Sequence, residues 1–395
     1  MFNDARREEL ISFCREMIRT PSLSGQEEKV AQLVAQKMEK FDYDKVEFDE
    51  YGNVAGSILL GKGGSTILLE GHMDHVEVSD PSRWTTDPFG AEIKNGRIYG
   101  RGTTDMKGNL AAMIYAGAMV KEVLGNSING EVVVAGSVHE ECFEGVASES
   151  IGKRYEPDYV VIGEPSNLTL KRGQRGRAEV VLETYGKTAH SSDPSVGLNA
   201  IKKMVTALAS IEREFVPRVH PVLGKGILEV TDIISSPYPG ASVIPDLCRA
   251  TFDRRLLVGD DPETVLKQVE EIMRKASMDD QDLNTRVTLA EGKDRCYTGK
   301  EIEATRFAPA WLFDEDDPFV KRSLEGLRSM GIDPEISHYY FCTNGSYYAG
   351  KAGIPTIGFG GSLETLAHVV DEYIEISHLI RACEGYWGII KANLS

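Results

Sequence analysis

EVVVAGSVHEE, residues 131–141, is a largely apolar stretch that ends in two adjacent glutamates, and it carries the main signal for the fold class. DYVVIGEP, residues 158–165, repeats the pattern and ends in Glu164. Runs of this kind, separated by helical patterns, predict strands that are buried on both faces of a largely parallel sheet. Open α/β sheets place their functional sites at the carboxyl ends of such strands. We therefore expect an α/β fold with a site at this edge.

Five short segments carry metal-type ligands at or near the ends of predicted strands. Their candidate ligands are two histidines, several carboxylates and no thiol. Such a set is typical of a hydrolytic metal centre, whereas structural zinc sites are usually local and rich in cysteine. The segments are GHMDH (71–75), GTTDMKG (102–108), VHEECFEG (138–145), VIGEPS (161–166) and ETLAHVVDE (364–372).

Two of these motifs contain pairs of side chains that can take different tasks. On a strand, His72 and Asp74 point to the same side, so the carboxylate can orient a metal-bound imidazole. Neighbouring side chains on extended backbone point apart, so Glu140 and Glu141 can divide the roles of base and metal ligand. Two carboxylates at a buried strand end repel each other, and nothing in a fold alone requires that arrangement.

Asp105 lies at the tip of the glycine-rich loop GRGTTDMKG (100–108). The loop lacks the GxxxxGK[ST] pattern of a phosphate-binding loop, which disfavours a nucleotide site. An aspartate here can bridge two cations, or it can cap the helix that follows. Glu164 and His368 are unremarkable alone, and their occurrence together with the other motifs makes them candidate ligands.

The hydrophobic periodicity changes near residue 176 and changes back near residue 295. Between these points the pattern predicts strand, helix, strand, strand, helix, strand, which is typical of a ferredoxin-like α+β unit. Because the α/β pattern then resumes and contains His368, this unit is an insertion. We expect a discontinuous catalytic domain over residues 1–176 and 295–395, and an inserted domain over residues 177–294. Near the N-terminus, Ser24 is expected to cap a helix over residues 27–40.

Composition limits the partners and the compartment. A net charge of −17 argues against nucleic acid or an anionic membrane surface as a partner. Residues 1–20 show a charged amphipathic pattern unlike a signal peptide, and no apolar run is long enough to span a membrane. Six cysteines without a CxxC pair are typical of reduced, buried thiols, so we expect a cytoplasmic protein.

The motifs, taken in order, resemble those of the co-catalytic metallohydrolases that include aminoacylase, acetylornithine deacetylase, succinyl-diaminopimelate desuccinylase and glutamate carboxypeptidases. The resemblance covers nearly the whole chain and includes RGQRG (172–176), GKTAHSS (186–192) and VIPD (243–246). PAWLFDEDDPF (309–319) and CTNG (342–345) are similar to a branch described as selenium-metabolism-linked hydrolases. The resemblance implies a zinc-peptidase-like α/β/α catalytic domain with an inserted dimerisation or lid domain, and hence a homodimer.

The resemblance also implies two divalent metal ions in each subunit. His72, Asp105 and Glu164 would bind one ion, while Asp105, Glu141 and His368 would bind the other. Zinc is the default for histidine and carboxylate ligands, and oxygen-rich ligation also suits cobalt or manganese.

The catalytic roles follow from the same resemblance. Glu140 would be the general base, Asp74 would orient the metal-bound histidine, and His190 would polarise the substrate carbonyl from the partner subunit. The residues expected to contact the substrate are Arg255, its neighbour Arg254, Asn344 and Ser242. The last two depart from the family pattern, because many relatives have Asp in place of Asn344 and Asn in place of Ser242.

The expected function is metal-dependent hydrolysis of a linear amide in a small N-acyl or N-carbamoyl amino acid. A dipeptidase or carboxypeptidase with the same mechanism is the alternative within this class. A non-catalytic, dimeric binding protein that keeps the fold is a third possibility, but such a protein has little need of Glu140.

Overall fold

The structure, a computed structural model, describes residues 3–394 (of Asn126 the backbone alone) and consists of two compact units. Residues 1, 2 and 395 of the expected catalytic domain lie outside the described residues. One unit contains the chain up to Gln174, Lys293–Glu303 and the chain from Trp311 onward, and the other contains Arg175–Gly292 and Ala304–Ala310. The last segment, expected in the catalytic domain, joins the second unit because β17 (Phe307–Ala308) pairs with β9 (Gly176–Tyr185).

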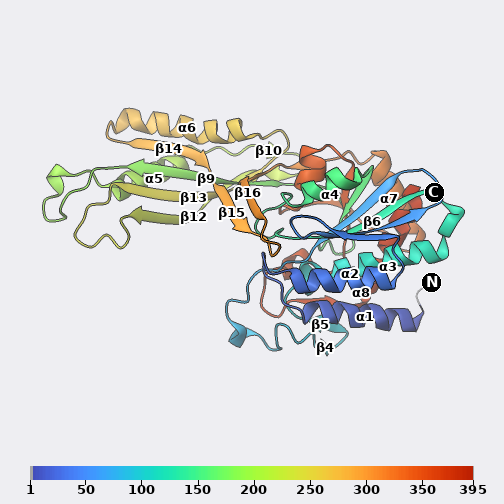
Figure 1. Cartoon of the computed structure of the whole chain (residues 1–395). Helices are drawn as coiled ribbons and strands as arrows, with labels where there is room; N and C mark the ends of the chain where they lie inside the picture. The colour runs from blue at the N-terminus through green and yellow to red at the C-terminus, as the bar shows by residue number, and fades with distance from the viewer. Residues whose placement is uncertain (1–2, 395) are drawn as a thin grey trace. The chain divides into compact units, whose positions relative to one another are not determined.

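The first unit is built on a nine-stranded mixed sheet (Figure 1). Its central strands, β6, β3, β7 and β20, run parallel, and antiparallel strands flank them. The apolar runs of the sequence form this parallel centre, where both faces are covered. In sheet order the strands are β1 (Lys45–Phe48), β2 (Val54–Leu60), β6 (Gly130–Ser137), β3 (Thr66–His72), β7 (Tyr159–Ile162), β20 (Thr356–Gly358), β8 (Leu170–Gln174) and β18 (Trp311–Leu312), with β19 (Ile336–Tyr339) beside β8.

Helices cover both faces of this sheet. On one face α3 is buried almost all round, because it packs between the sheet and the outer helices, and its sequence is correspondingly apolar. On the other face Ile151 of α4 packs against Leu68, Val133 and Val160 of the central strands. The helices of the unit are α1 (Asp4–Ile18), α2 (Glu28–Lys40), α3 (Gly108–Val123), α4 (Ser148–Tyr155), α7 (Pro318–Ser329) and α8 (Ile376–Leu394).

A small three-stranded sheet in the same unit was not evident from the sequence. It consists of β21 (Tyr373–Glu375), β5 (Arg97–Tyr99) and β4 (Ile93–Lys94). Strands of two or three residues are too short to give a hydrophobic period. The pairing of Tyr373 with Tyr99 places the loop that follows β5 beside the loop that precedes β21. Those loops contain Asp105 and His368, respectively.

The second unit has the element order that the sequence predicts, namely β9, α5, β12, β13, α6 and β14. The five strands of its main sheet are all antiparallel, in the order β12-β13-β9-β14 with β17 beside β9. Both helices pack on one face, over a core that includes Val180, Met204, Phe252 and Val269. The α/β fold with an inserted ferredoxin-like α+β unit is thus confirmed. The bounds are α5 (Ala200–Glu214), β12 (Ile227–Ser236), β13 (Leu247–Leu256), α6 (Pro262–Asp279) and β14 (Asn284–Leu289), with a further ribbon formed by β10 (Val219–His220) and β11 (Gly224–Lys225). Another ribbon, formed by β15 (Glu291–Arg295) and β16 (Glu301–Thr305), lies mostly within Lys293–Glu303, which belongs to the first unit.

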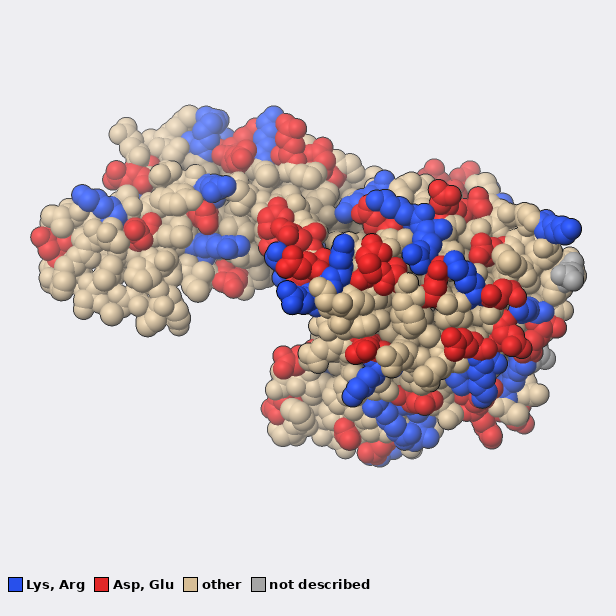
Figure 2. Space-filling model, viewed as in Figure 1, with Lys and Arg blue, Asp and Glu red and all other residues tan. Residues whose placement is uncertain are grey.

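Charged side chains of both signs are interspersed on the face shown in Figure 2. The part of the second unit that carries β12 shows few charged side chains in this view. Within residues 3–394, no helix combines the length and the apolar character that crossing a membrane requires.

Candidate metal centre

The carboxyl edge of the parallel strands carries four of the predicted site residues. His72 is the last residue of β3, and Glu140 and Glu141 follow the neighbouring strand β6. Glu164 follows β7, which pairs with the other side of β3. The parallel register therefore brings side chains from three loops to one place, as expected for an open α/β sheet.

Asp105 lies between two imidazoles. Its Oδ1 is 2.8 Å from Nε2 of His72, and its Oδ2 is 3.1 Å from Nε2 of His368. Nε2 of His368 is also 3.0 Å from Oε2 of Glu141. Asp105 does not cap α3, since the residue before that helix is Lys107, which makes no side-chain capping bond. A carboxylate whose two oxygens face separate imidazoles has the arrangement of a bridging ligand.

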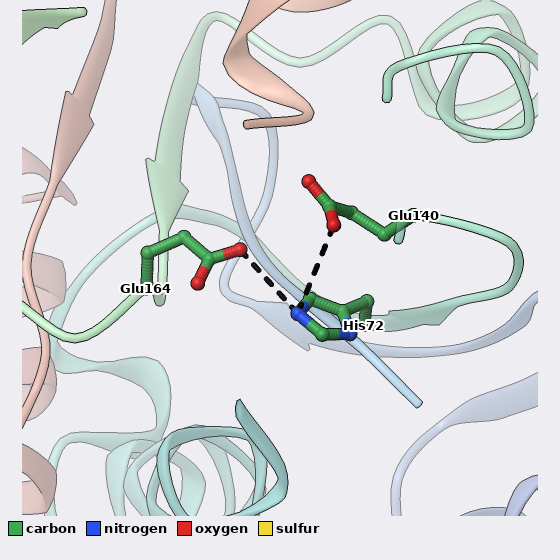
Figure 3. Close-up of side chains that lie close together, drawn as sticks. All are labelled: His72, Glu140 and Glu164. Carbon is green, nitrogen blue, oxygen red and sulfur yellow. Dashed lines mark ion pairs between the residues drawn. The ribbon is translucent and has the colours of Figure 1, made fainter. Parts of the chain in front are cut away.

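Two groups of side chains have ligand atoms within 4.8 Å of one another, close enough to share a cation. In the first, shown in Figure 3, the carboxylates of Glu140 and Glu164 point toward Nε2 of His72, at 4.0 and 3.5 Å. The second combines His72 with Asp105 and Glu141. The sets implied by the family resemblance differ in that Asp105 takes the place of Glu140 in the first set and His368 takes the place of His72 in the second.

Buried carboxylates outnumber imidazoles in this cluster. Burial, and then the charge of Asp105, raise the pKa of Glu164 well above its ordinary value. Burial would lower the pKa of His72, but Glu164 and a hydrogen bond with Asp105 outweigh it and raise that pKa. Hydrogen bonds with Asp105 and Glu141 raise the pKa of His368 to about 10. Oxygen and imidazole donors with an excess of buried negative charge fit divalent cations, which would supply the missing positive charge.

Asp74 is fully buried, and its carboxylate and backbone carbonyl together contact three parts of the site. Oδ1 accepts a hydrogen bond from the backbone N of Glu140, and Oδ2 accepts one from the backbone N of Glu141, both over 3.2 Å. Nδ1 of His72 lies 3.0 Å from the carbonyl oxygen of Asp74, which leaves Nε2 to face the cluster. Ser24 donates to Oδ2 over 2.7 Å. The expectation that Ser24 caps α2 is therefore wrong, and α2 begins without a side-chain cap.

Glu372 and Arg101, which the sequence did not single out, hold the backbone around Asp105. Oε1 of Glu372 accepts hydrogen bonds from the backbone N of Thr104 over 2.8 Å and of Asp105 over 3.2 Å. Its other oxygen pairs with Arg101. Glu372 is the last residue of the segment ETLAHVVDE that contains His368. An acidic residue so close to a candidate ligand was the signal by which the sequence could have indicated Glu372.

Asn344 lies in the first unit, but its amide is engaged in buried hydrogen bonds. It donates to Glu70 and to Ser137, and it accepts from the backbone N of Gly145. Both amide hydrogens are thereby used. The expected contact between Asn344 and the substrate is corrected to a structural role, because the side chain has no donor left to offer.

The other four predicted residues lie in the second unit. His190 is exposed, and its Nδ1 accepts a hydrogen bond from the backbone N of Ser192 over 3.1 Å. Oγ of Ser192 lies 2.7 Å from the same ring nitrogen. The carbonyl of Ser242 accepts from the backbone N of Ser191 over 2.8 Å, so Ser242 neighbours the His190 segment.

Arg254 and Arg255 point to opposite faces of β13. Arg254 is 2% exposed and donates to the carbonyl of Ile227 over 3.2 Å and to Oε1 of Gln268 over 3.1 Å. The expectation that it contacts substrate is corrected, because its guanidinium is buried in the packing of the second unit. Arg255 is half-buried and pairs with Asp253 through Nε over 2.7 Å.

Comparisons with known proteins show sequences that are similar to this chain. Residues 68–392 match the family described as Peptidase family M20/M25/M40. Over 390 residues the chain is 34% identical to the Uncharacterized protein YgeY of Escherichia coli (strain K12), covering 96% of this chain and 93% of that one. It is 32% identical over 349 residues to the acetylornithine deacetylase of Vibrio vulnificus (strain CMCP6), covering 85% and 82% of the two chains.

Solved structures share the fold at low identity. The M20 family metallo-carboxypeptidase Sso-CP2 from Sulfolobus solfataricus gives a TM-score of 0.74 at 19% identity, with 98% of this chain and 99% of that chain covered. The YXEP protein of Bacillus subtilis, described as a dinuclear metal binding peptidase, gives 0.70 at 14% identity and covers 100% of both chains.

Proposed function

Because the chain belongs to peptidase family M20/M25/M40, a family of hydrolases, we propose that it cleaves the linear amide bond of a small N-acyl or N-carbamoyl amino acid. The family expected from the motifs is thereby confirmed. The observation that carries the proposal is Asp105, whose two oxygens face His72 and His368 inside a cluster of buried carboxylates. Such a carboxylate is suited to bridging two cations in a hydrolytic site.

We propose that two divalent ions occupy this cluster, as in the dinuclear structural relative. His72, Asp105 and Glu164 would hold one ion, and Asp105, Glu141 and His368 would hold the other. Zinc is the default, and the oxygen-rich donor set also suits cobalt or manganese. When bound, such ions acidify water and polarise the amide carbonyl.

Glu140 has the environment of a general base. Burial, and then the charge of Glu164 against an opposing effect of His72, raise the pKa of Glu140 well above its ordinary value. Asp74 fixes the backbone N of Glu140. In the proposed reaction Glu140 takes a proton from the attacking water and delivers it to the leaving nitrogen as the carbon–nitrogen bond breaks. Nε2–H of His190 would donate to the oxyanion of the tetrahedral intermediate.

Deacylase and peptidase activities remain the two candidates within this class. The acetylornithine deacetylase of Vibrio vulnificus matches over most of this chain at 32% identity and favours a deacylase. The metallo-carboxypeptidase Sso-CP2 is more remote in sequence, at 19% identity. Arg255, half-buried on β13, is the proposed contact for the carboxylate that N-acyl amino acids and dipeptides share.

A substrate panel tests the proposal. N-acetyl, N-succinyl and N-carbamoyl amino acids and dipeptides are incubated with protein reconstituted with zinc, manganese or cobalt. We expect turnover of N-acyl amino acids that disappears in Glu140→Ala. Preferential turnover of dipeptides would favour the peptidase, whereas two bound ions without turnover of any amide would contradict the proposed substrate class.

We further propose that the protein forms a homodimer through its second unit. β12 is an edge strand of its sheet, and edge strands present unpaired backbone groups to other chains. Its exposed apolar side chains include Val230 (41% exposed), Ile233 (52%) and Ile234 (50%). Sedimentation analysis of the wild type and of Ile233→Lys tests the proposal, and a wild type that sediments as a monomer would contradict it.

If the dimer forms, we propose that His190 acts on the substrate bound by the partner subunit. Mixing Glu140→Ala chains with His190→Ala chains then produces mixed dimers with one intact site. We expect the mixture to regain activity that neither variant has alone. Subunit-exchanged mixtures that stay inactive would rule out this arrangement.

A further inference from the structure

Asn344 holds the end of the loop that carries Glu140 and Glu141. Its Oδ1 accepts a hydrogen bond from the backbone N of Gly145 over 2.6 Å. Asp74 holds the start of the same loop through the backbone N of Glu140 and Glu141. The loop between β6 and α4 is therefore fixed at both ends by the side chains of other segments.

Asn344 is itself held by the strands of the central sheet. Its Nδ2 donates to Oε1 of Glu70 and to Oγ of Ser137, both over 2.9 Å. Glu70 lies on β3 before His72, and Ser137 ends β6. All three side chains are at most 5% exposed. The contacts thus connect the strand that supplies His72 with the loop that supplies Glu140.

The buried carboxylate of Glu70 requires hydrogen-bond donors. A buried acceptor that has no donor loses its hydrogen bonds to water and gains none in the protein. Asn344 supplies a donor, and the hydroxyl of Ser148 donates to the same Oε1 over 2.6 Å. An aspartate at position 344 would keep the acceptor for Gly145 but would set an acceptor against Oε1 of Glu70. The donor and acceptor pattern of the pair therefore calls for an amide at position 344.

We propose that Glu70 and Asn344 are a matched pair of positioning residues that place the loop with Glu140 and Glu141 relative to His72. The inference rests on the proposed roles of Glu140 as base and Glu141 as metal ligand.

The test is a reciprocal exchange of donor and acceptor. Asn344→Asp removes the donors, and Glu70→Gln in the same chain restores one from the opposite side. We expect Asn344→Asp to lower kcat roughly tenfold or more with KM nearly unchanged, because a small displacement of the base is costly. We expect Glu70→Gln/Asn344→Asp to recover most of that loss, and Glu70→Gln alone to cost less than Asn344→Asp.

Two readouts separate this inference from the proposed substrate class. Metal retention against a chelator and the thermal unfolding midpoint need no substrate, and both should fall in Asn344→Asp and recover in the double variant. A wild type without amidase activity would contradict the substrate class, while these two readouts would still decide the pairing. If Asn344→Asp does not fold, recovery is read as the return of folded, metal-binding protein.

Asn393→Asp is the matched control. Asn393 of α8 is also buried, accepts from Nε of Arg322 over 3.0 Å and donates to Oγ of Ser323 over 3.1 Å. We expect this variant to change the unfolding midpoint but neither kcat nor metal retention. A double variant no better than Asn344→Asp, in kcat and in metal retention, would overturn the inference.

Discussion

Arg101 and Glu372 form a buried ion pair, in which Nη1 of Arg101 donates to Oε2 of Glu372 over 2.6 Å, with 5% and 0% of the side chains exposed. The other carboxylate oxygen holds the backbone N of Thr104 and Asp105. The pair thus fixes the loop of Asp105 to the segment of His368. A residue that contacts metal ligands without binding the metal itself still determines how well the ligands are positioned.

We expect Glu372→Gln to weaken metal binding by roughly 10- to 100-fold, because the amide keeps the size of the side chain but loses the ion pair with Arg101. Titration of zinc into chelator-stripped protein measures this effect. Glu375→Gln is the matched control, since Glu375 pairs with Arg97 at 3.2 Å with 41% and 38% of the side chains exposed. Equal losses in the two variants would show that the effect is not specific to the buried pair.

Glu140→Gln separates a base from a metal ligand. If Glu140 is the base, kcat falls by about 10²- to 10⁴-fold while two ions remain bound, because the amide cannot take up the proton. Measurement of bound metal alongside turnover distinguishes a base from a ligand, since Glu140 could also hold a cation together with His72 and Glu164. Loss of an ion together with activity would make Glu140 a ligand. Glu144→Gln, in the same loop, serves as the control that should retain both.

His75 makes stability depend on pH. Burial, and then the charge of Lys107, lower its pKa from 6.5 to about 4, and its Nε2 accepts a hydrogen bond from the backbone N of Ser22 over 2.9 Å. His75 therefore takes up a proton below about pH 6.5 in the unfolded chain, but only below about pH 4 in the folded protein. Lowering the pH through this window should cost up to about 3 kcal/mol of unfolding free energy.

Denaturant unfolding of metal-free wild type and His75→Gln between pH 7 and pH 4.5 measures this contribution. The glutamine can still donate and accept but does not titrate, so its stability should fall less steeply over that range. Parallel pH profiles for the two proteins would contradict the assignment to His75.

The two arginines of β13 should behave differently. Arg255→Gln should raise KM for substrates with a free carboxylate, by roughly tenfold if it loses a charge-assisted hydrogen bond. Arg254→Met should lower the unfolding midpoint and leave KM unchanged, since Arg254 bonds Ile227 and Gln268 inside the second unit. Steady-state kinetics with an N-acyl amino acid and with its amide tests both. A rise in KM in Arg254→Met alone would reverse the assignment.

The long strands and helices of the molecule could be predicted from the sequence. Apolar runs ending in Glu140 and Glu164 predicted the parallel centre of the sheet, because continuous burial leaves a continuous pattern. The βαββαβ order of the second unit was predicted because the hydrophobic period of strands and that of helices alternate along this part of the chain. The sheet containing Tyr99 and Tyr373 did not follow, because its strands are shorter than any period.

The candidate site was predictable only in part, for a related reason. A strand end tells where His72 points, but the sequence does not name the partner of a buried polar side chain. Ser24 was therefore read as a helix cap although it donates to Asp74. Asn344 was read as a substrate contact although its hydrogens go to Glu70 and Ser137. Both errors concern contacts between segments far apart in the chain.

The small sheet of β21, β5 and β4 also has a consequence for protein synthesis. Translation produces Asp105, Glu140, Glu141 and Glu164 long before it produces His368 and the strand β21 that fixes the His368 segment beside β5. Until that segment leaves the ribosome, the nascent chain carries these four carboxylates and His72 without His368. The proposed second metal position includes His368, so we expect both ions to be loaded only after the segment that contains His368 and β21 has been made.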